Sequence, residues 1–180
     1  TDAFSACNRY RTRYFNKLTA ERYNMQQVLL LSGNEDSDIS KVASALCERF
    51  DKMLLVHVAE MNQFVQAGLQ EINDTTTAAL EQKILRIRNS VSVAANAIDM
   101  RYGVIMVDDL DETSLDIYKT ECRTANVAPV HIIFLNQSSR TISNPELIGH
   151  VFDHKSDLNP HQKADQIQKI IGTNQSLLAT

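Results

Sequence analysis

Residues 26–46 read QQVLLLSGNEDSDISKVASAL, and this stretch decides the class of fold. The apolar run over 28–31 is short and continuous, and a turn-like Ser-Gly-Asn follows it at 32–34. Such a run is typical of a strand buried on both faces of a parallel sheet. After the turn, apolar residues recur at helical spacing over 39–50. The stretch therefore predicts a strand, a turn and a helix, in that order.

The same alternation of strand and helix continues along the chain. Short apolar runs predict further strands over 53–58, 103–107, 129–135 and 150–152. Helical spacing predicts helices over 61–72, 80–98, 113–125 and 160–171. Repeated alternation favours parallel strands joined by right-handed crossovers, with helices on both faces of the sheet. We expect a three-layer α/β/α fold with a five-stranded parallel sheet in the flavodoxin-like order 2-1-3-4-5.

We interpret residues 25–172 as one α/β domain, with an N-terminal helix over 1–24 and a loose polar tail over 173–180. The chain between the second and third strands is lengthened by a helical insertion over 74–100. Its apolar residues step by three and four, as in a heptad seam: Leu80, Ile84, Ile87, Val91, Ala94 and Ile98. We expect the seam, or the N-terminal helix, to form a homodimer or to dock a neighbouring domain. The alternative is that the seam simply covers the sheet.

Composition excludes several classes of protein. Apolar residues make up 43% of the chain and charged residues 22%, as in ordinary globular domains. The formal net charge of -4 argues against nucleic acid or an anionic membrane as the main partner, and no apolar run is long enough to span a bilayer. The widely spaced Cys7, Cys47 and Cys122 offer no disulfide framework and no CxxC metal pair. We expect a reducing, cytoplasmic compartment.

Acidic residues crowd the end of the third expected strand, in GVIMVDDLDETSLDIYK over 103–119. With the first strand and helix, this stretch resembles the receiver domain of bacterial two-component response regulators. The resemblance implies that Asp108 is the phosphoacceptor and that a Mg²⁺ ion held by neighbouring acids offsets the charge during phosphoryl transfer. A Ser-Gly pair occupies the positions of the family's first two acids, which leaves Asp108, Glu35 and Asp36 as metal ligands. We therefore expect weak Mg²⁺ binding.

The last two strands carry the rest of this resemblance. PVHIIFLNQSS over 129–139 places Asn136 at the family's switch Thr or Ser, and LIGHVFDHKSDLNPHQKADQI over 147–167 supplies the switch aromatic Phe152. Lys155, three residues later, stands where the family's lysine pairs with the phosphoryl oxygens. Because Asn136 lacks a hydroxyl, the resemblance implies a degenerate receiver. We expect a signalling module that acts by binding proteins, with phosphoacceptor chemistry weakened or lost, and not an enzyme.

A second resemblance provides the alternative. VLLLSGNEDSDISKVASAL over 28–46 lies where nucleoside-monophosphate kinases carry their phosphate-binding loop, and YGVIMVDD over 102–109 resembles their third strand with its metal-binding acid. A P-loop requires GxxxxGK[ST], so that backbone amides and a lysine hold the phosphates. From Gly33 this chain continues with three acids and no lysine before the helix. The alternative is thus a kinase-like domain that has lost its P-loop and serves as a scaffold or nucleotide sensor.

Overall fold

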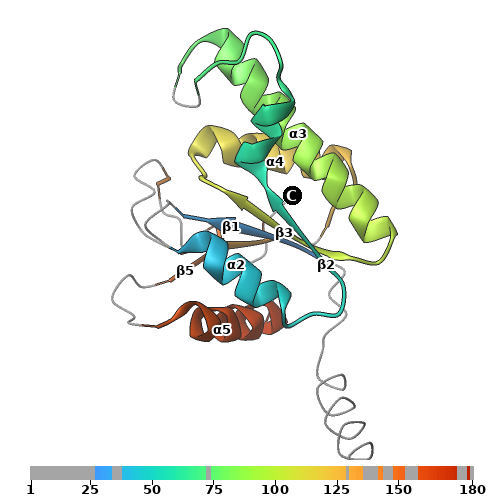
Figure 1. Ribbon diagram of the computed structural model, residues 1–180, viewed down its shortest axis with the longest axis vertical. Helices are drawn as coiled ribbons and strands as arrows, with labels where there is room; N and C mark the ends of the chain where they lie inside the picture. The colour runs from blue at the N-terminus through green and yellow to red at the C-terminus, as the bar shows by residue number, and fades with distance from the viewer. Residues whose placement is uncertain are drawn as a thin grey trace, which may run out of the picture.

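The computed structural model describes residues 27–33, 38–71, 74–128, 130–135, 142–143, 148–152, 158–173 and 178. Within these residues the expected α/β fold is confirmed: five parallel strands lie between two layers of helices (Figure 1). The elements follow in the order β1 (Val28–Ser32), α2 (Ile39–Cys47), β2 (Met53–His57), η2 (Val58–Phe64), α3 (Thr77–Asp99), β3 (Gly103–Asp108), α4 (Glu112–Thr124), β4 (Val130–Phe134), β5 (His150–Val151) and α5 (Pro160–Thr173). The expected N-terminal helix, the tail over 173–180 apart from Thr173 and Leu178, and Cys7 lie outside the described residues.

The order of the strands differs from the flavodoxin-like expectation. The sheet runs β2-β3-β1-β4-β5, so β3 lies between β2 and β1, and β1 lies between β3 and β4. In the expected order β1 would have paired with β2. Apolar runs such as 28–31 and 103–107 show that a strand is buried on both faces, but they do not specify its neighbours. The alternation of elements was therefore predictable, and the order of the central strands was not.

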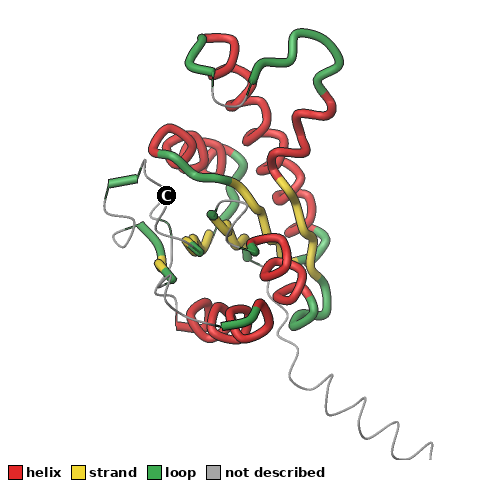
Figure 2. The backbone as a smooth tube through the Cα atoms, turned by 60° about the vertical axis from the view of Figure 1, so that its left-hand side comes forward, coloured by secondary structure: helices red, strands yellow, loops and turns green. Residues whose placement is uncertain are grey.

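Two layers of helices cover opposite faces of the sheet (Figures 1 and 2). On one face, α2 and α5 pack against alternate strand residues to form a core that includes Leu29, Leu31, Leu46 and Ile133. On the other face, η2, α3 and α4 enclose a second core. Each residue of β1, β3 and β4 is buried, because both faces of these strands are covered.

The segment between β2 and β3 differs in part from the expected pattern. The helix expected over 61–72 is instead the short 3₁₀ helix η2, which ends where Val65 adopts an extended backbone. Gly68, with φ of 74°, takes a left-handed conformation that an α-helix cannot contain. The long helix α3 begins after Thr76, whose hydroxyl accepts a hydrogen bond from the Ala79 amide at 3.2 Å.

The apolar seam of α3 contributes to the core in its middle and faces outward at its start. Ile87, Val91 and Ala94 are at most 1% exposed and pack in the core beneath α3, whereas Leu80 is 43% exposed. The middle of the seam thus covers the sheet, and the homodimer stays a prediction. In the described part of the chain no helix is both long and apolar enough to cross a membrane.

Candidate functional site

The carboxyl ends of β1 and β3 meet at one edge of the sheet. Ser32 and Asp108 are register partners, so the turn after β1 and the acidic turn after β3 begin side by side. Ser32 is 1% exposed, and its hydroxyl accepts a hydrogen bond from the Leu110 amide at 3.2 Å. Ligands of open α/β sheets bind beyond the carboxyl ends of the strands, so this edge is the candidate site.

Asp108 is the buried acid of the site. It is 6% exposed, and its carboxylate accepts hydrogen bonds from the Tyr118 hydroxyl at 2.8 Å and from the Asp109 amide at 3.1 Å. Burial raises the pKa of Asp108 to about 6, against the opposing effects of the Arg86 charge and of these two hydrogen bonds. Both oxygens are therefore engaged inside the protein, which leaves Asp108 poorly placed to attack a phosphoryl group.

Asp109 faces the other way. Its side chain is at the surface, and no described residue donates a hydrogen bond to its carboxylate. Partial burial and the negative charge of Asp111 raise its pKa, while Lys83 acts in the opposite direction. Two adjacent acids of the same strand end thus differ in their environments: Asp108 is bonded within the protein, and Asp109 is available to a ligand.

Asp111 anchors the start of α4. Its carboxylate caps the helix by accepting a hydrogen bond from the Ser114 amide at 2.6 Å, and it receives the Lys83 ammonium at 2.6 Å. Burial acts to raise its pKa, but the hydrogen bonds from Lys83 and Ser114 hold that pKa below its ordinary value. The acidic turn after β3 is thereby tied to both α3 and α4.

Two cations of α3 lie above this edge. Lys83 reaches Asp111, and one turn further along the helix Arg86 lies close enough to Asp108 and Tyr118 for its charge to lower the pKa of both groups. Arg86 is 7% exposed, and its buried Nε has no hydrogen-bond partner. Arg86, Lys83 and Tyr118 were not predicted from the sequence. The only signal for the two cations was their spacing, three residues apart on one helix, and Tyr118 had none.

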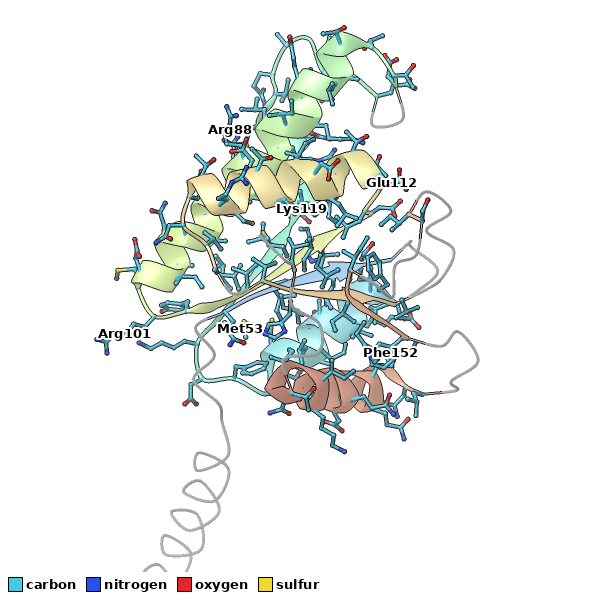
Figure 3. All side chains as sticks on the ribbon, turned by 180° about the vertical axis from the view of Figure 1, so that it is seen from behind. Met53, Arg88, Arg101, Glu112, Lys119 and Phe152 are labelled. Atoms are coloured by element: carbon cyan, nitrogen blue, oxygen red, sulfur yellow. The ribbon has the colours of Figure 1, made fainter. Side chains whose placement is uncertain are left out.

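The structure brings together few of the residues that the receiver resemblance selected. Phe152 is 5% exposed and packs on the α2 and α5 side of the sheet, with its ring edge-on to His150 at 5.4 Å (Figure 3). Asp108 is buried on the opposite side, among residues of α3 and α4. Asn136, Lys155, Glu35 and Asp36 lie outside the described residues. The role of Lys155 in pairing with phosphoryl oxygens thus stays a prediction.

The metal site stays a prediction as well. The described residues contain no group of three Asp, Glu, His or Cys side chains that could hold a metal ion. Asp108 alone cannot supply the several oxygens that Mg²⁺ requires, and its two oxygens already accept hydrogen bonds.

An open groove elsewhere in the molecule is the main competing site. It lies between α2 and the start of α5, and its lining includes Ser40, Lys41, Ser44 and His161. Its one lysine, Lys41, is already paired with Asp38 at 2.7 Å. No buried unpaired group points to a ligand there among the described residues.

Comparison with known proteins places the fold. No family model matches the sequence, and no curated protein matches it. Solved structures do match: the APS kinase CysC of Mycobacterium tuberculosis, as its Cys556Ala mutant, is 13% identical, with a TM-score of 0.60 over 81% of this chain and 96% of that one. A sugar kinase from Janibacter is 12% identical, with a TM-score of 0.58 over 83% and 96% of the two chains.

A third structure, the tunicamycin resistance protein of Deinococcus radiodurans, is 15% identical, with a TM-score of 0.56 over 86% of this chain and 99% of that one. At such identities these likenesses show the fold alone, which this chain shares with two kinases and a resistance protein. They overturn the interpretation of the chain as a receiver-like signalling module of a two-component system. They also contradict the expectation that it is not an enzyme, because an APS kinase and a sugar kinase share its fold. The resemblance that agrees with the structure is the kinase-like one.

Proposed function

We propose that this chain is a kinase-fold protein that binds a nucleotide or another phosphorylated small molecule at the carboxyl edge of its sheet. The observation that carries the proposal is the strand order β2-β3-β1-β4-β5, which sets the end of β1 directly beside the acidic end of β3. The kinase-fold structures support it, as does the sequence likeness of β1 and β3 to nucleoside-monophosphate kinases. The edge is polar and is held in place by the Ser32–Leu110 and Tyr118–Asp108 hydrogen bonds.

The connection from β1 to α2 sets the chemistry of this proposal. It runs from Gly33 to Asp38 with three acids and no basic residue. The first lysine, Lys41, lies within α2 and pairs with Asp38 at 2.7 Å. A free triphosphate would be repelled by these acids, and Mg²⁺ would reduce the repulsion. We therefore expect nucleotides with fewer phosphates, or nucleotides loaded with Mg²⁺, to bind better than free ATP.

Calorimetric titration of the full chain with ATP, ADP and AMP, each with and without Mg²⁺, tests the proposal. Adenosine is the matched control, because it lacks only the phosphates. We expect saturable one-to-one binding of at least one phosphorylated form and weaker binding of adenosine. ADP release from ATP in the presence of candidate acceptors would identify a phosphotransferase. Absence of binding by all three nucleotides at millimolar concentration would contradict the nucleotide form of the proposal, and the same result with inorganic phosphate would contradict the proposal as a whole.

The thiols support a cytoplasmic location as part of the same proposal. Cys47 and Cys122 are both free, and burial raises the pKa of Cys122 to about 12, so its thiol stays protonated and unreactive. Free structural thiols are typical of a reducing compartment. Fractionation of cells that produce the protein, followed by thiol labelling, would test this location.

A further inference from the structure

Arg86 is the buried charged group whose bonding in the described structure is least complete. The residue is 7% exposed, its Nε is enclosed without a hydrogen-bond partner, and no described acceptor receives a bond from its guanidinium. Buried polar groups in folded proteins are nearly always hydrogen-bonded, and an orphaned donor commonly marks an absent water, ion or ligand. Arginine is also the side chain best shaped to bind phosphate oxygens.

A second arginine on the same helix shows how unusual this is. Arg88 has a side chain that is 59% exposed, yet it makes two hydrogen bonds to the Glu121 carboxylate, at 3.0 and 2.9 Å. It lies on the outer side of α3, beside α4 (Figure 3). The arginine that water could solvate thus makes two hydrogen bonds to one carboxylate, whereas the enclosed arginine donates none to any described residue. Packing of α3 alone does not require this distribution, since a buried apolar residue at 86 would satisfy the same helix face.

The surroundings of Arg86 place it at the candidate site. Its charge acts on Asp108, the last residue of β3, and on Tyr118, which donates to Asp108. Lys83, three residues earlier on α3, reaches Asp111 at 2.6 Å. The two cations of α3 therefore lie along the turn that follows β3. No basic residue occurs in the turn after β1, where a P-loop has its lysine.

We propose that Arg86 binds a phosphate oxygen of the ligand, so that α3 supplies the positive charge that the β1–α2 connection lacks. This inference rests on the proposed function and names the residue that would hold the phosphate. Lys83 is already matched by Asp111, which leaves Arg86 as the donor with bonding capacity to spare. The ligand group is an oxyanion of the phosphate class, either free inorganic phosphate or the phosphate of a nucleotide.

The acids at this edge limit how strongly a phosphate can bind. Asp108 balances Arg86, Asp111 is paired with Lys83, and Asp109 is left as a negative charge at the surface. A phosphate that enters adds negative charge, which is best tolerated where Asp108 takes up a proton. We therefore expect a modest affinity for phosphate that depends on Arg86, weaker than the affinity of an intact P-loop.

Nitrogen-15 NMR of the arginine side chains tests this inference in the unaltered chain. The Nε–H signal of Arg86, assigned by its loss in Arg86→Gln, is followed during titration with ADP and, separately, with inorganic phosphate. We expect it to shift in a saturable way while the Arg88 signal stays in place. A shift with both probes indicates recognition of phosphate itself, and a shift with ADP alone indicates recognition of phosphate carried by the nucleotide.

Matched variants supply the second readout. Arg86→Gln should weaken ADP binding at least tenfold, and Arg88→Gln should change it less than twofold. If Arg86→Gln fails to fold, the Arg86 signal is assigned by triple-resonance spectra of the unaltered chain, and its titration still decides the question. Binding of ADP with an unmoved Arg86 signal would overturn this inference and leave the proposed function intact. Failure of the unaltered chain to bind any phosphorylated ligand would overturn both.

Discussion

The two faces of the sheet differ in what they bury. The face covered by α2 and α5 is closed mainly by apolar residues, among them Leu29, Leu46 and Ile167, with the ring of His131 of β4 buried beside them. The face covered by α3 and α4 buries apolar residues too, but it also encloses Arg86 and Asp108. Burying charge is costly, whereas burying leucine stabilises the fold. The residues buried on the first face are accounted for by folding alone. On the second face, the buried charges of Arg86 and Asp108 point to a function.

The largest expected effect lies on the apolar face. Leu46→Ala removes a fully buried side chain from α2 and should lower the free energy of unfolding by about 2–5 kcal/mol, because it loses burial and leaves a cavity. Ligand affinity at the opposite face should not change in the fraction that is folded. Urea unfolding measures the effect, with Leu85→Ala as control, since Leu85 is 46% exposed. If Leu46→Ala lowers the free energy of unfolding no more than Leu85→Ala does, the face covered by α2 and α5 is not the stabilising core that the structure indicates.

Asp108 should give the polar face its pH dependence. Its folded pKa of about 6 lies above the ordinary value of 3.8, so between these values the folded state binds more protons than the unfolded state. The free energy of unfolding should therefore fall by roughly 3 kcal/mol in all as the pH rises through this window. Above the window it should stay level. Asp108→Asn should remove this contribution.

Chemical unfolding at pH values from 4 to 7 measures the difference between wild type and Asp108→Asn. The control is Asp116→Asn, because Asp116 lies nearby in the sequence, on α4, but its side chain is 79% exposed. Parallel stability profiles for wild type and Asp108→Asn would show that Asp108 does not titrate as the structure implies.

Tyr118→Phe should have a smaller effect. The change removes the hydroxyl that donates to Asp108 at 2.8 Å and leaves the ring in place. Loss of one hydrogen-bond donor to a buried carboxylate lowers the free energy of unfolding by about 1–3 kcal/mol, so the variant should be less stable at neutral pH. The loss should shrink toward pH 4, where Asp108 is protonated. A loss that is the same at both pH values would show that the hydroxyl does not act through Asp108.

The smallest expected effect is at the surface of the same helices. Arg88 and Glu121 join α3 to α4 through two hydrogen bonds, but the Arg88 side chain is mostly exposed. Water and salt screen such pairs, so Arg88→Gln should lower the unfolding midpoint less than Tyr118→Phe does. The difference in unfolding midpoint between Arg88→Gln and wild type should be smaller in about 0.5 M salt. Charges are screened over shorter distances there than at about 0.1 M, where the screening length is about 10 Å. A larger loss than that of Tyr118→Phe would show that the outer contact, not the buried one, holds α3 on α4.

The sequence predicted the elements well because their causes are local. The apolar runs over 28–31 and 103–107 and the helical spacing over 39–50 each act within a few residues. The strand order was wrong because pairing between buried parallel strands depends on contacts far apart in the chain. The site was predicted in part: the acidic end of β3 was selected, but the inward bonding of Asp108 was not. That bonding depends on the Tyr118 hydroxyl, which only the fold brings to Asp108.

Location of the ligand is the central claim, and backbone NMR tests it most directly. The ¹H–¹⁵N spectrum of the full chain is recorded during titration with ADP and Mg²⁺. The account predicts that the amides of Gly33, Asp109 and Leu110, at the ends of β1 and β3, shift together and saturate at one equivalent. Shifts confined to the groove between α2 and α5, at Ser40, Lys41 and His161, would contradict it.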